Sequence, residues 1–366
     1  MMFVPQAAPG LRFERYRAEI DAAIARTLDR GQYVLGPAVE AFEAAFAEWL
    51  HAGYCVGVNS GTDAIALALR ALGVGPGDEV IAPSLTAAGT ALAILHCGAQ
   101  PRFADVDPLT RCLDPRAFEA AITDRTAAVI PVHLFGYPSE MTAIMGIARD
   151  HGIAVVEDCA QAHGTCINGR KAGTFGHAAA FSFYPTKNLG AAGDGGAVVT
   201  NDAALAEEVR RLRAYGWEDD RRISASLGFN SRLDELQAAI LRALLNHLDE
   251  GNCERRNIAA RYREALRGGA VALPPDHPGA VYHQFAVEYD NRDALMRHLH
   301  DEAGIGTAVH YFPPLHEQPI FSRADRASLP ETERLSRQLL SLPIQPEVAG
   351  RHFERIVAAV KEWSSR

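Results

Sequence analysis

Three short segments of the 366-residue chain combine residue types that could do chemistry. The first is Asn59-Ser60-Gly61-Thr62-Asp63, which follows an apolar run and begins a helical pattern. Gly61 allows a tight turn there, and the free amides in the first turn of a helix bind anions. The segment is therefore a candidate phosphate site, although Ser, Thr and Asp are also common helix caps.

The second segment is the acidic pair Glu157-Asp158, which ends an apolar strand pattern that begins at residue 154. An acid at the carboxyl end of a parallel strand lies where ligands bind in such sheets. It can pair there with a cation or a ring nitrogen, and it can equally cap the following helix. The residues alone leave both roles open.

The third segment contains Lys187, with Phe181, Phe183 and Tyr184 before it and glycine-rich chain after it. A lysine among aromatic residues can have a lowered pKa and act as a nucleophile, although most single lysines are solvated surface groups. Asp158 precedes Lys187 by 29 residues. An anion site, an acid and an amine are together the parts that pyridoxal phosphate requires.

Seven apolar runs predict the strands that would position these segments. Helical patterns lie between several of them, at residues 63–72, 86–95, 115–121 and 139–151. Apolar strands that alternate with helices predict a mostly parallel sheet covered on both faces. The expected strands are residues 55–59, 79–82, 100–104, 127–132, 154–157, 179–182 and 196–200.

The rest of the chain predicts a smaller unit. Residues 233–266 have apolar positions at helical spacing, which indicates one long or broken helix. Beyond it we expect a strand at 284–288, a helix at 292–302, a Pro-rich loop at 310–319 and a closing helix near 352–363. The predicted fold is α/β, with a large domain of residues 1–248 and a small α+β domain of residues 249–366.

Composition restricts the class of protein. Apolar residues make up 48% and charged residues 22%, as in ordinary globular proteins, and the net charge of −9 disfavours nucleic acid as a partner. The six cysteines form no C-x-x-C pair, so we expect neither a disulfide framework nor a zinc site. Residues 80–99 carry no charge, but Pro83, Ser84 and Gly89 indicate strand, loop and helix rather than a membrane span. We see no export signal and expect a cytoplasmic protein.

Ordered motifs extend over nearly the whole chain. They are GxYxLGP at 31–37, SGTDAI at 60–65, PSLTAAGTALAI at 83–94, DVDPLT at 105–110, PVHLFG at 131–136, EDCAQAHG at 157–164, FSFYPTKNLGAAGDGG at 181–196, NSRLDELQAA at 230–239 and HYFPPLHEQPIF at 310–321. In these motifs the sequence resembles the DegT/DnrJ/StrS family of sugar aminotransferases. That resemblance implies the aspartate aminotransferase fold, fold type I of the enzymes that use pyridoxal phosphate.

The resemblance also implies roles for individual residues. Lys187 is expected to be the Schiff-base lysine and acid/base, Asp158 to pair with the pyridinium nitrogen, and Gln161 to lie beside the cofactor ring. Asn230 is expected to reach the phosphate of the neighbouring subunit, so that the active sites form only in a homodimer. The implied phosphate ligands are Gly61, Thr62, Asp63 and Ser182. The implied substrate-pocket residues, which could equally be packing residues, are Tyr33, Tyr215, His310, Tyr311 and His316. No metal is expected.

The implied activity is transfer of an amino group from an amino acid, by family habit L-glutamate, to a nucleotide-linked keto sugar. Pyridoxal phosphate would cycle through pyridoxamine phosphate. The EDCAQAHG and TAAGT forms resemble members that aminate 3-keto sugars, which favours a dTDP-3-keto-6-deoxyhexose as acceptor. Two alternatives are a dehydratase of the same family, which would carry His in place of Lys187, and a regulator that binds the cofactor without turnover.

One position departs from the family pattern. In many relatives the residue after the threonine of P-S-x-T is aromatic and lies flat on the cofactor ring, whereas here it is Ala87. Ring stacking contributes roughly 0.5–1.5 kcal/mol beyond area burial. Either that face is open, or another group covers it, and we expect His163 to be that group.

Overall fold

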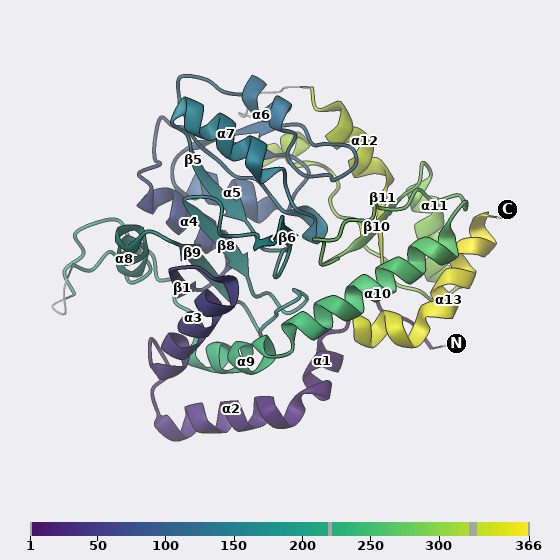
Figure 1. The fold of residues 1–366 in the computed structure, drawn as a ribbon, viewed down its shortest axis with the longest axis horizontal. Helices are drawn as coiled ribbons and strands as arrows, with labels where there is room; N and C mark the ends of the chain where they lie inside the picture. Colours follow the sequence, from purple (N-terminus) through teal and green to yellow (C-terminus); the bar gives the residue numbers. More distant parts are fainter. Residues whose placement is uncertain (1, 219–221, 322–327, 365–366) are drawn as a thin grey trace.

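The computed structural model describes residues 2–218, 222–321 and 328–364, and a seven-stranded sheet lies at its centre (Figure 1). The strand order is β1-β9-β8-β5-β4-β2-β3. Only β9 runs against the other six, because it pairs antiparallel with both β1 and β8. The bounds are β1 Tyr54–Val58, β2 Glu79–Pro83, β3 Gln100–Ala104, β4 Thr126–Val129, β5 Ala154–Asp158, β8 Ala178–Ser182 and β9 Gly196–Thr200. The predicted α/β class and mostly parallel seven-stranded sheet are confirmed.

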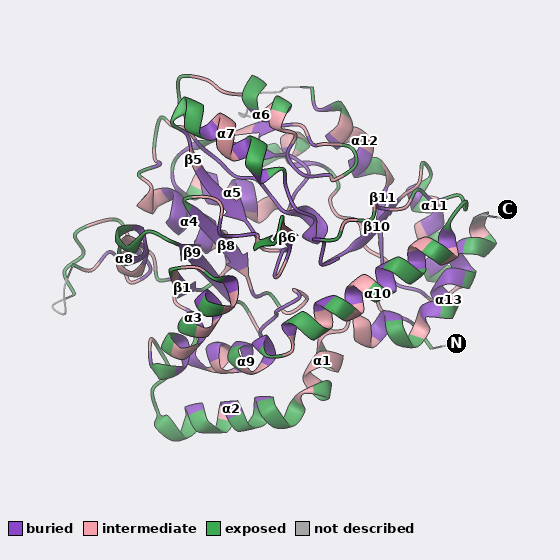
Figure 2. Ribbon diagram, viewed as in Figure 1, coloured by how far each residue is buried: buried purple, intermediate pink, exposed green. Residues whose placement is uncertain are grey.

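Helices cover both faces of this sheet, so its strands are mostly buried (Figure 2). On β8, Ala178 and Ala180 join the apolar cluster under α4, α5 and α8, while Ala179 and Phe181 join the cluster under α3 and α9. This alternation is the period of two of a β-strand. Helices α6 and α7 cover the second face beyond α3. The bounds are α3 Pro37–Leu50, α4 Gly61–Ala71, α5 Ala88–His96, α6 Pro115–Ala120, α7 Met141–His151, α8 Ala203–Leu212 and α9 Glu235–Leu245.

The C-terminal part forms around a two-stranded sheet and two long helices. These are β10 (Phe285–Glu288), β11 (Leu339–Leu342), α10 (Leu248–Leu266) and α13 (Pro346–Ser364). The shorter helices are α11 Arg292–Arg297 and α12 Pro330–Gln338, and a small hairpin of β6 Cys166–Ile167 and β7 Arg170–Lys171 follows β5 in the chain. The N-terminal residue Val4 pairs with Ile305, so the start of the chain lies against this part.

Several elements differ from the expectations. The helix expected at 292–302 is α11 followed by one π-helical turn at His298–Glu302, whereas the long or broken helix expected at 233–266 is present as α9 and α10. Helices α1 (Pro9–Arg15), α2 (Arg17–Arg30) and α3 lie where we named no elements. Helix α10 begins at Leu248, and the division into domains 1–248 and 249–366 stays a prediction.

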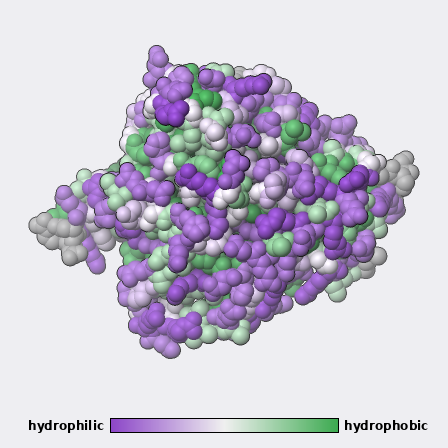
Figure 3. Space-filling view, in the orientation of Figure 1, coloured by the Kyte–Doolittle hydropathy of each residue, from purple (hydrophilic) through white to green (hydrophobic). Residues whose placement is uncertain are grey.

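Residues 80–99 form β2, a loop and α5, as expected. In the part of the chain that the structure describes, no helix is long and apolar enough to cross a bilayer. Polar side chains predominate on the face shown in Figure 3, and apolar ones appear there in small groups.

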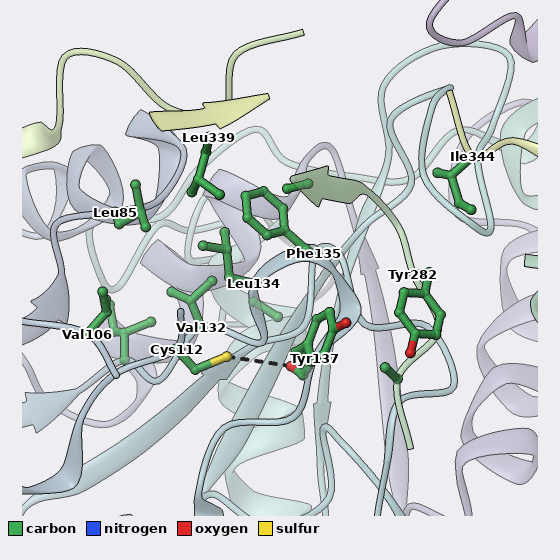
Figure 4. Close-up of a cluster of buried hydrophobic side chains, with 14 of the residues drawn as sticks. Leu85, Val106, Cys112, Val132, Leu134, Phe135, Tyr137, Tyr282, Leu339 and Ile344 are labelled. Atoms are coloured by element: carbon green, nitrogen blue, oxygen red, sulfur yellow. Dashed lines mark hydrogen bonds between the residues drawn. The ribbon is translucent and has the colours of Figure 1, made fainter. Parts of the chain in front are cut away.

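A continuous apolar cluster joins the sheet to the C-terminal part (Figure 4). Leu134, Phe135 and Tyr137, from the segment after β4, lie in it with Tyr282 and with Leu339 of β11. These side chains are at most 1% exposed. Close packing leaves these side chains little room to move. The segment at 134–137 is therefore held in place by residues from both parts of the chain.

A buried carboxylate holds the start of α3 against the start of α9. Glu235 is 1% exposed, and its oxygens accept from the amides of Gly36, Ala38 and Val39 at 2.8–2.9 Å. A helix leaves its first amides without partners inside the helix, and an acid there also favours the helix dipole. The carboxylate of Glu235 therefore joins two of the sequence motifs, those at 31–37 and 230–239.

Replacing Glu235 with Ala is expected to lower the free energy of unfolding by about 3 kcal/mol, because three buried amides lose a charged acceptor. Urea unfolding followed by circular dichroism measures the change. Glu40→Ala, on the exposed side of α3, is the matched control and should change stability by no more than about 0.5 kcal/mol. Equal midpoints for the two variants would show that Glu235 does not hold this helix.

Candidate active site

The three candidate segments meet at one edge of the sheet. Asp158 ends β5, Ser182 ends the neighbouring β8, and α4 begins directly after β1. Strands β5 and β8 are parallel, with Asp158 in register with Ala180. Their carboxyl ends therefore lie side by side, which is where open α/β sheets bind ligands.

Two glycines allow α4 to approach the sheet closely. A Cβ on Gly61 would lie 2.7 Å from Cβ of Ser182, and one on Gly196 would lie 2.3 Å from the carbonyl carbon of Ser60. A larger residue at either place would separate α4 from β8 and β9. The first turn of the helix thus lies next to Ser182.

The first turn of α4 has both capped and free amides. Ser60 is the N-cap, and its hydroxyl accepts from the amide of Asp63 at 3.1 Å. The amides of Gly61 and Thr62 have no acceptor among the described residues. The carboxylate of Asp63 accepts from the Ser231 hydroxyl at 2.7 Å. Gly61, Thr62 and Ser182 thus offer free donors to an anion, whereas Asp63 has its amide and one carboxylate oxygen engaged.

Asp158 is the acid that faces the site. It is 4% exposed, and its carboxylate accepts from the Thr90 hydroxyl at 2.8 Å and from the amide of Ala160 at 3.0 Å. Burial raises the pKa of Asp158, and the Ala160 amide, the Thr90 hydroxyl and Lys187 oppose that rise. Thr90 is a partner that sequence reasoning missed, although it lies in the motif at 83–94.

Glu157 points to the opposite side of the strand and has a structural role. Its wholly buried carboxylate accepts from the amides of Gly173, Phe175 and Gly176 at 2.7–2.8 Å and lies 3.1 Å from Nε2 of His133. Burial alone would raise the pKa of Glu157, but these contacts lower it overall. The contacts of Glu157 are thus all with the protein itself, and Asp158 is the acid of the pair that remains on the side of the site.

Lys187 is half-buried, and its amine has no hydrogen-bond or ion-pair partner among the described residues. Burial lowers the pKa of Lys187 to about 8, and the charge of Asp158 opposes this shift. Burial raises the pKa of Asp158, and the charge of Lys187 is one of the contributions that oppose this rise. The two groups are close enough to interact, as the sequence-based roles require.

Gln161 and Tyr311 form a fixed pair on the C-terminal side of the site. The amide of Phe135 donates to Oε1 of Gln161 at 2.8 Å, so Nε2 of Gln161 donates to the Tyr311 hydroxyl oxygen at 2.9 Å. Burial raises the pKa of Tyr311 to about 12. Its hydroxyl therefore stays protonated, and its own hydrogen is available to a ligand.

The two predicted histidines have different surroundings. Nδ1 of His310 lies 2.9 Å from the Ser341 hydroxyl, and burial followed by the charge of Lys187 lowers its pKa to about 4. His316 lies 2.7 Å from the Ser84 hydroxyl and 3.6 Å from Glu333. His310 is thus a neutral group near Lys187, whereas both ring nitrogens of His316 are engaged in holding the Pro-rich loop.

Tyr33, Tyr215 and Asn230 lie on the surface of the single chain. Tyr33 is 50% and Tyr215 is 38% exposed, and Asn230 is also exposed. Tyr215 stands near Arg232 and Trp217, in a segment that extends beyond α8 (Figure 1). The structure describes no contact of these three residues with Lys187, so their site roles stay predictions.

His163 lies in the core beneath β8. It is wholly buried, its ring centroid is 5.5 Å from that of Phe181 and 5.8 Å from that of Phe183, and neither ring nitrogen has a hydrogen-bond partner among the described residues. Burial, then the charge of Lys187, lowers its pKa to about 3. The half-buried Ala87 precedes α5, and no contact joins it to His163 in the described chain. That His163 covers the cofactor face stays a prediction.

His283 is a further site residue that sequence reasoning missed. It is 4% exposed, lies 3.2 Å from Oδ1 of Asn188, and has a pKa well below the usual range because of burial and then Lys187. It precedes β10 in the chain and matches none of the motifs, so only the tertiary structure reveals it.

Comparison with known proteins agrees with this geometry. The "dTDP-3-amino-3,4,6-trideoxy-alpha-D-glucose transaminase" of Streptomyces venezuelae is 48% identical over 97% of this chain and 94% of its own length. The "Erythromycin biosynthesis sensory transduction protein EryC1" of Saccharopolyspora erythraea is 47% identical over 94% of this chain and 95% of its own length.

Solved structures agree over the full length of this chain. The crystal structure of S. venezuelae DesV in complex with a ketimine intermediate has a TM-score of 0.96 at 48% identity and is covered completely. That of NtdA from Bacillus subtilis with bound cofactor PMP has a TM-score of 0.93 at 31% identity, with 86% of it covered. The family model also matches residues 14–361. The chain therefore belongs to the DegT/DnrJ/EryC1/StrS aminotransferase family.

Proposed function

We propose that this protein uses pyridoxal phosphate to transfer an amino group from an amino acid, L-glutamate by family habit, to a nucleotide-linked keto sugar. The observation that carries the proposal is that the Lys187 amine lies close enough to the buried carboxylate of Asp158 for their charges to interact. The amine has no hydrogen-bond or ion-pair partner among the described residues, and its pKa is about 8. Free helix amides lie at the same sheet edge.

The described residues fit this cofactor. The amides of Gly61 and Thr62 and the hydroxyl of Ser182 suit a phosphate, because a helix N-terminus favours anions. A Cβ on Gly89 would lie 2.5 Å from Oγ1 of Thr62, so a larger side chain at Gly89 would displace that hydroxyl. When bound, the cofactor supplies an electron sink for the bond that loses its proton.

Asp158 would hold the proton on the ring nitrogen. Its carboxylate cannot rotate freely, because Thr90 and the Ala160 amide engage its two oxygens. Burial removes water that would screen its charge, so the carboxylate acts strongly on a cation beside it. The cation would in turn keep Asp158 ionised, against the effect of burial.

Lys187 would bind the cofactor covalently and then move protons as the base. A pKa of about 8 leaves on the order of a tenth of the amines neutral at pH 7, against fewer than one in a thousand for an ordinary lysine. Both nucleophilic attack and proton abstraction need the neutral form. The Tyr311 hydroxyl would donate to the sugar, and neutral His310 would donate to or accept from it.

The acceptor is proposed as a 3-keto sugar carried on dTDP. The S. venezuelae relative is named for a dTDP-3-amino sugar. The motifs at 157–164 and 86–90 also resemble those of family members that aminate 3-keto sugars. Against a dehydratase stands Lys187, where those enzymes carry His. The name of EryC1 suggests a regulator, which an amine-transfer assay with glutamate separates from an enzyme.

The proposed assembly is a homodimer with shared sites, in the cytoplasm. Exposed Asn230 supports sharing, because the next residue, Ser231, bonds to Asp63 at the start of α4. A residue there could reach a neighbouring subunit across the surface. The direct test of the activity is mass spectrometry of the products after the pyridoxamine-loaded enzyme meets a panel of nucleotide keto sugars. If the enzyme forms an amino sugar from none of these substrates, the proposal is wrong.

Lys187→Ala is expected to abolish borohydride-trapped cofactor and transamination together, because no other amine among the described residues lies beside Asp158. The chain has only two other lysines, and Lys171→Ala is the matched control, since burial also lowers the Lys171 pKa. In the parent protein, the rate of cofactor capture should rise with pH and level off above about pH 8, because the neutral amine reacts. An active Lys187→Ala enzyme would refute the assignment.

Asp158→Asn is expected to keep the fold and bound cofactor but lower kcat by about a hundredfold or more, since a neutral amide cannot stabilise the ring cation by charge. Steady-state kinetics and cofactor absorbance measure the two effects separately. Asp202→Asn, at the exposed N-cap of α8, is the same substitution outside the site and should leave kcat unchanged. Near-normal turnover of Asp158→Asn would remove Asp158 from the mechanism.

Subunit mixing tests the shared site. A heterodimer of one inactive Lys187→Ala subunit and one inactive Asn230→Asp subunit should recover part of the activity, because one of its sites keeps both groups. Differently tagged subunits allow the heterodimer to be isolated, and each variant mixed with itself is the control. An inactive heterodimer would show that Asn230 serves its own subunit.

A further inference from the structure

The loop that carries Lys187 turns four of its carbonyl groups toward one point. The loop is closed where the amide of Ala191 donates to the carbonyl of Phe183 at 2.7 Å. Within it, the amide of Lys187 donates to Tyr184 at 2.9 Å. The carbonyls of Pro185, Lys187, Asn188 and Gly190 all accept from a single side chain, that of Arg12.

Arg12 reaches this point from α1, more than 170 residues earlier in the chain. Its Nη1 donates to Lys187 at 2.8 Å and to Asn188 at 3.0 Å. Its Nη2 donates to Pro185 at 2.8 Å and to Gly190 at 3.4 Å. A planar guanidinium with five donors can hold several carbonyls in one arrangement, which the point charge of a lysine cannot.

Gly190 provides independent evidence that the loop is shaped for this side chain. A Cβ on Gly190 would lie 2.6 Å from Nη2 of Arg12 and 2.5 Å from the Pro185 carbonyl oxygen. Any other residue would therefore push the guanidinium or the loop away. The φ of Gly190 is not in the left-handed region, so close approach is the reason for glycine here.

Helix α1 is itself anchored to the C-terminal part of the chain. Arg15 contacts Glu254 of α10 at 2.9 Å, and the amide of Ala8 donates to Gln345 at 2.7 Å. The other side of the loop is tied to the same part, because Nδ2 of Asn188 donates to Asn252 of α10 at 2.9 Å. The backbone of Lys187 is thus held from two directions.

We propose that Arg12 is a positioning residue for Lys187, which fixes the loop backbone so that the amine stays desolvated at the end of β8 beside Asp158. The role rests on the proposed function, because that function is what requires the amine there. Without the guanidinium, four carbonyls of the loop would lose their hydrogen-bond donor, and the loop backbone would become less ordered.

The titration of Lys187 reports this position, because its neighbours are fixed. Asp158 faces it from β5, and the pKa values of His163, His283 and His310 respond to its charge. Burial lowers the pKa of each histidine, so all three are neutral above pH 6.5. Arg12→Lys keeps the positive charge that Arg12→Met removes, so a rise in the Lys187 pKa that both variants share reflects exposure of the amine.

The test uses the full chain without cofactor. Trace labelling of amines with acetic anhydride between pH 6.5 and 10, read by mass spectrometry, gives the Lys187 pKa with Lys361 as internal reference. Hydrogen exchange of peptides that cover residues 183–191 reports loop order. The variants are Arg12→Met and Arg12→Lys. Arg17→Met is the matched control, because the Arg17 side chain is exposed and pairs only with Asp21 of its own helix α2 among the described residues.

Arg12→Met should raise the Lys187 pKa by about one unit from about 8, which reduces labelling at pH 8 about fivefold, and should speed loop exchange at least tenfold. Arg12→Lys should lie between it and the parent, and Arg17→Met should match the parent. A folded Arg12→Met protein with parental labelling and exchange would overturn the proposal. If Arg12→Met does not fold, Arg12→Lys decides by the same criterion. Failure of the parent to trap cofactor at Lys187 would instead refute the proposed function and leave these readouts intact.

Discussion

Two consecutive carboxylates at the end of one buried strand impose the main constraint on this structure. Burying a charge is costly unless it is paired or hydrogen-bonded, and β5 buries two such groups side by side. The pleat turns Glu157 and Asp158 to opposite sides of the sheet. Glu157 is satisfied by three amides of the segment at 173–176 and by His133, so that segment must fold back against β5.

Asp158 is left with fewer partners, which is why it can serve a ligand. Thr90 and one amide hold it, and the charges of Lys187 and His133 add to the stabilisation of its ionised form. The first turn of α4 adds free amides at the same edge, because Gly61 and Gly196 permit the close approach. The site therefore combines a cation, an anion and an anion-binding helix end, none of which is fully satisfied by the described residues themselves.

The groups around these three come from distant parts of the chain. Tyr311 and Gln161 are aligned by the amide of Phe135, whose side chain lies in the apolar cluster that joins the sheet to the C-terminal part (Figure 4). The loop of Lys187 is held by Arg12 from the N-terminal helix and by Asn252 from α10. Packing between the parts of the molecule therefore positions the reactive groups as much as the sheet does.

The sequence by itself determined the sheet and indicated the candidate reactive residues. Each predicted strand agrees with the structure to within about three residues, because short apolar runs between turn residues are local signals that burial in a parallel sheet reinforces. Lys187, Asp158 and Gly61 were identifiable because their motifs are contiguous. The tertiary structure alone decided which hydrogen-bond and charge partners each of these polar groups has. It gave Glu157 and Asp158 different partners. It also showed that the Asp63 amide and the His316 ring bond to other protein groups. Finally, it placed His283 and Arg12, which match none of the motifs, near Lys187. These outcomes depend on which donors and acceptors meet across long chain separations. The free energy of a buried polar group is set by those partners and not by the residues beside it in the sequence.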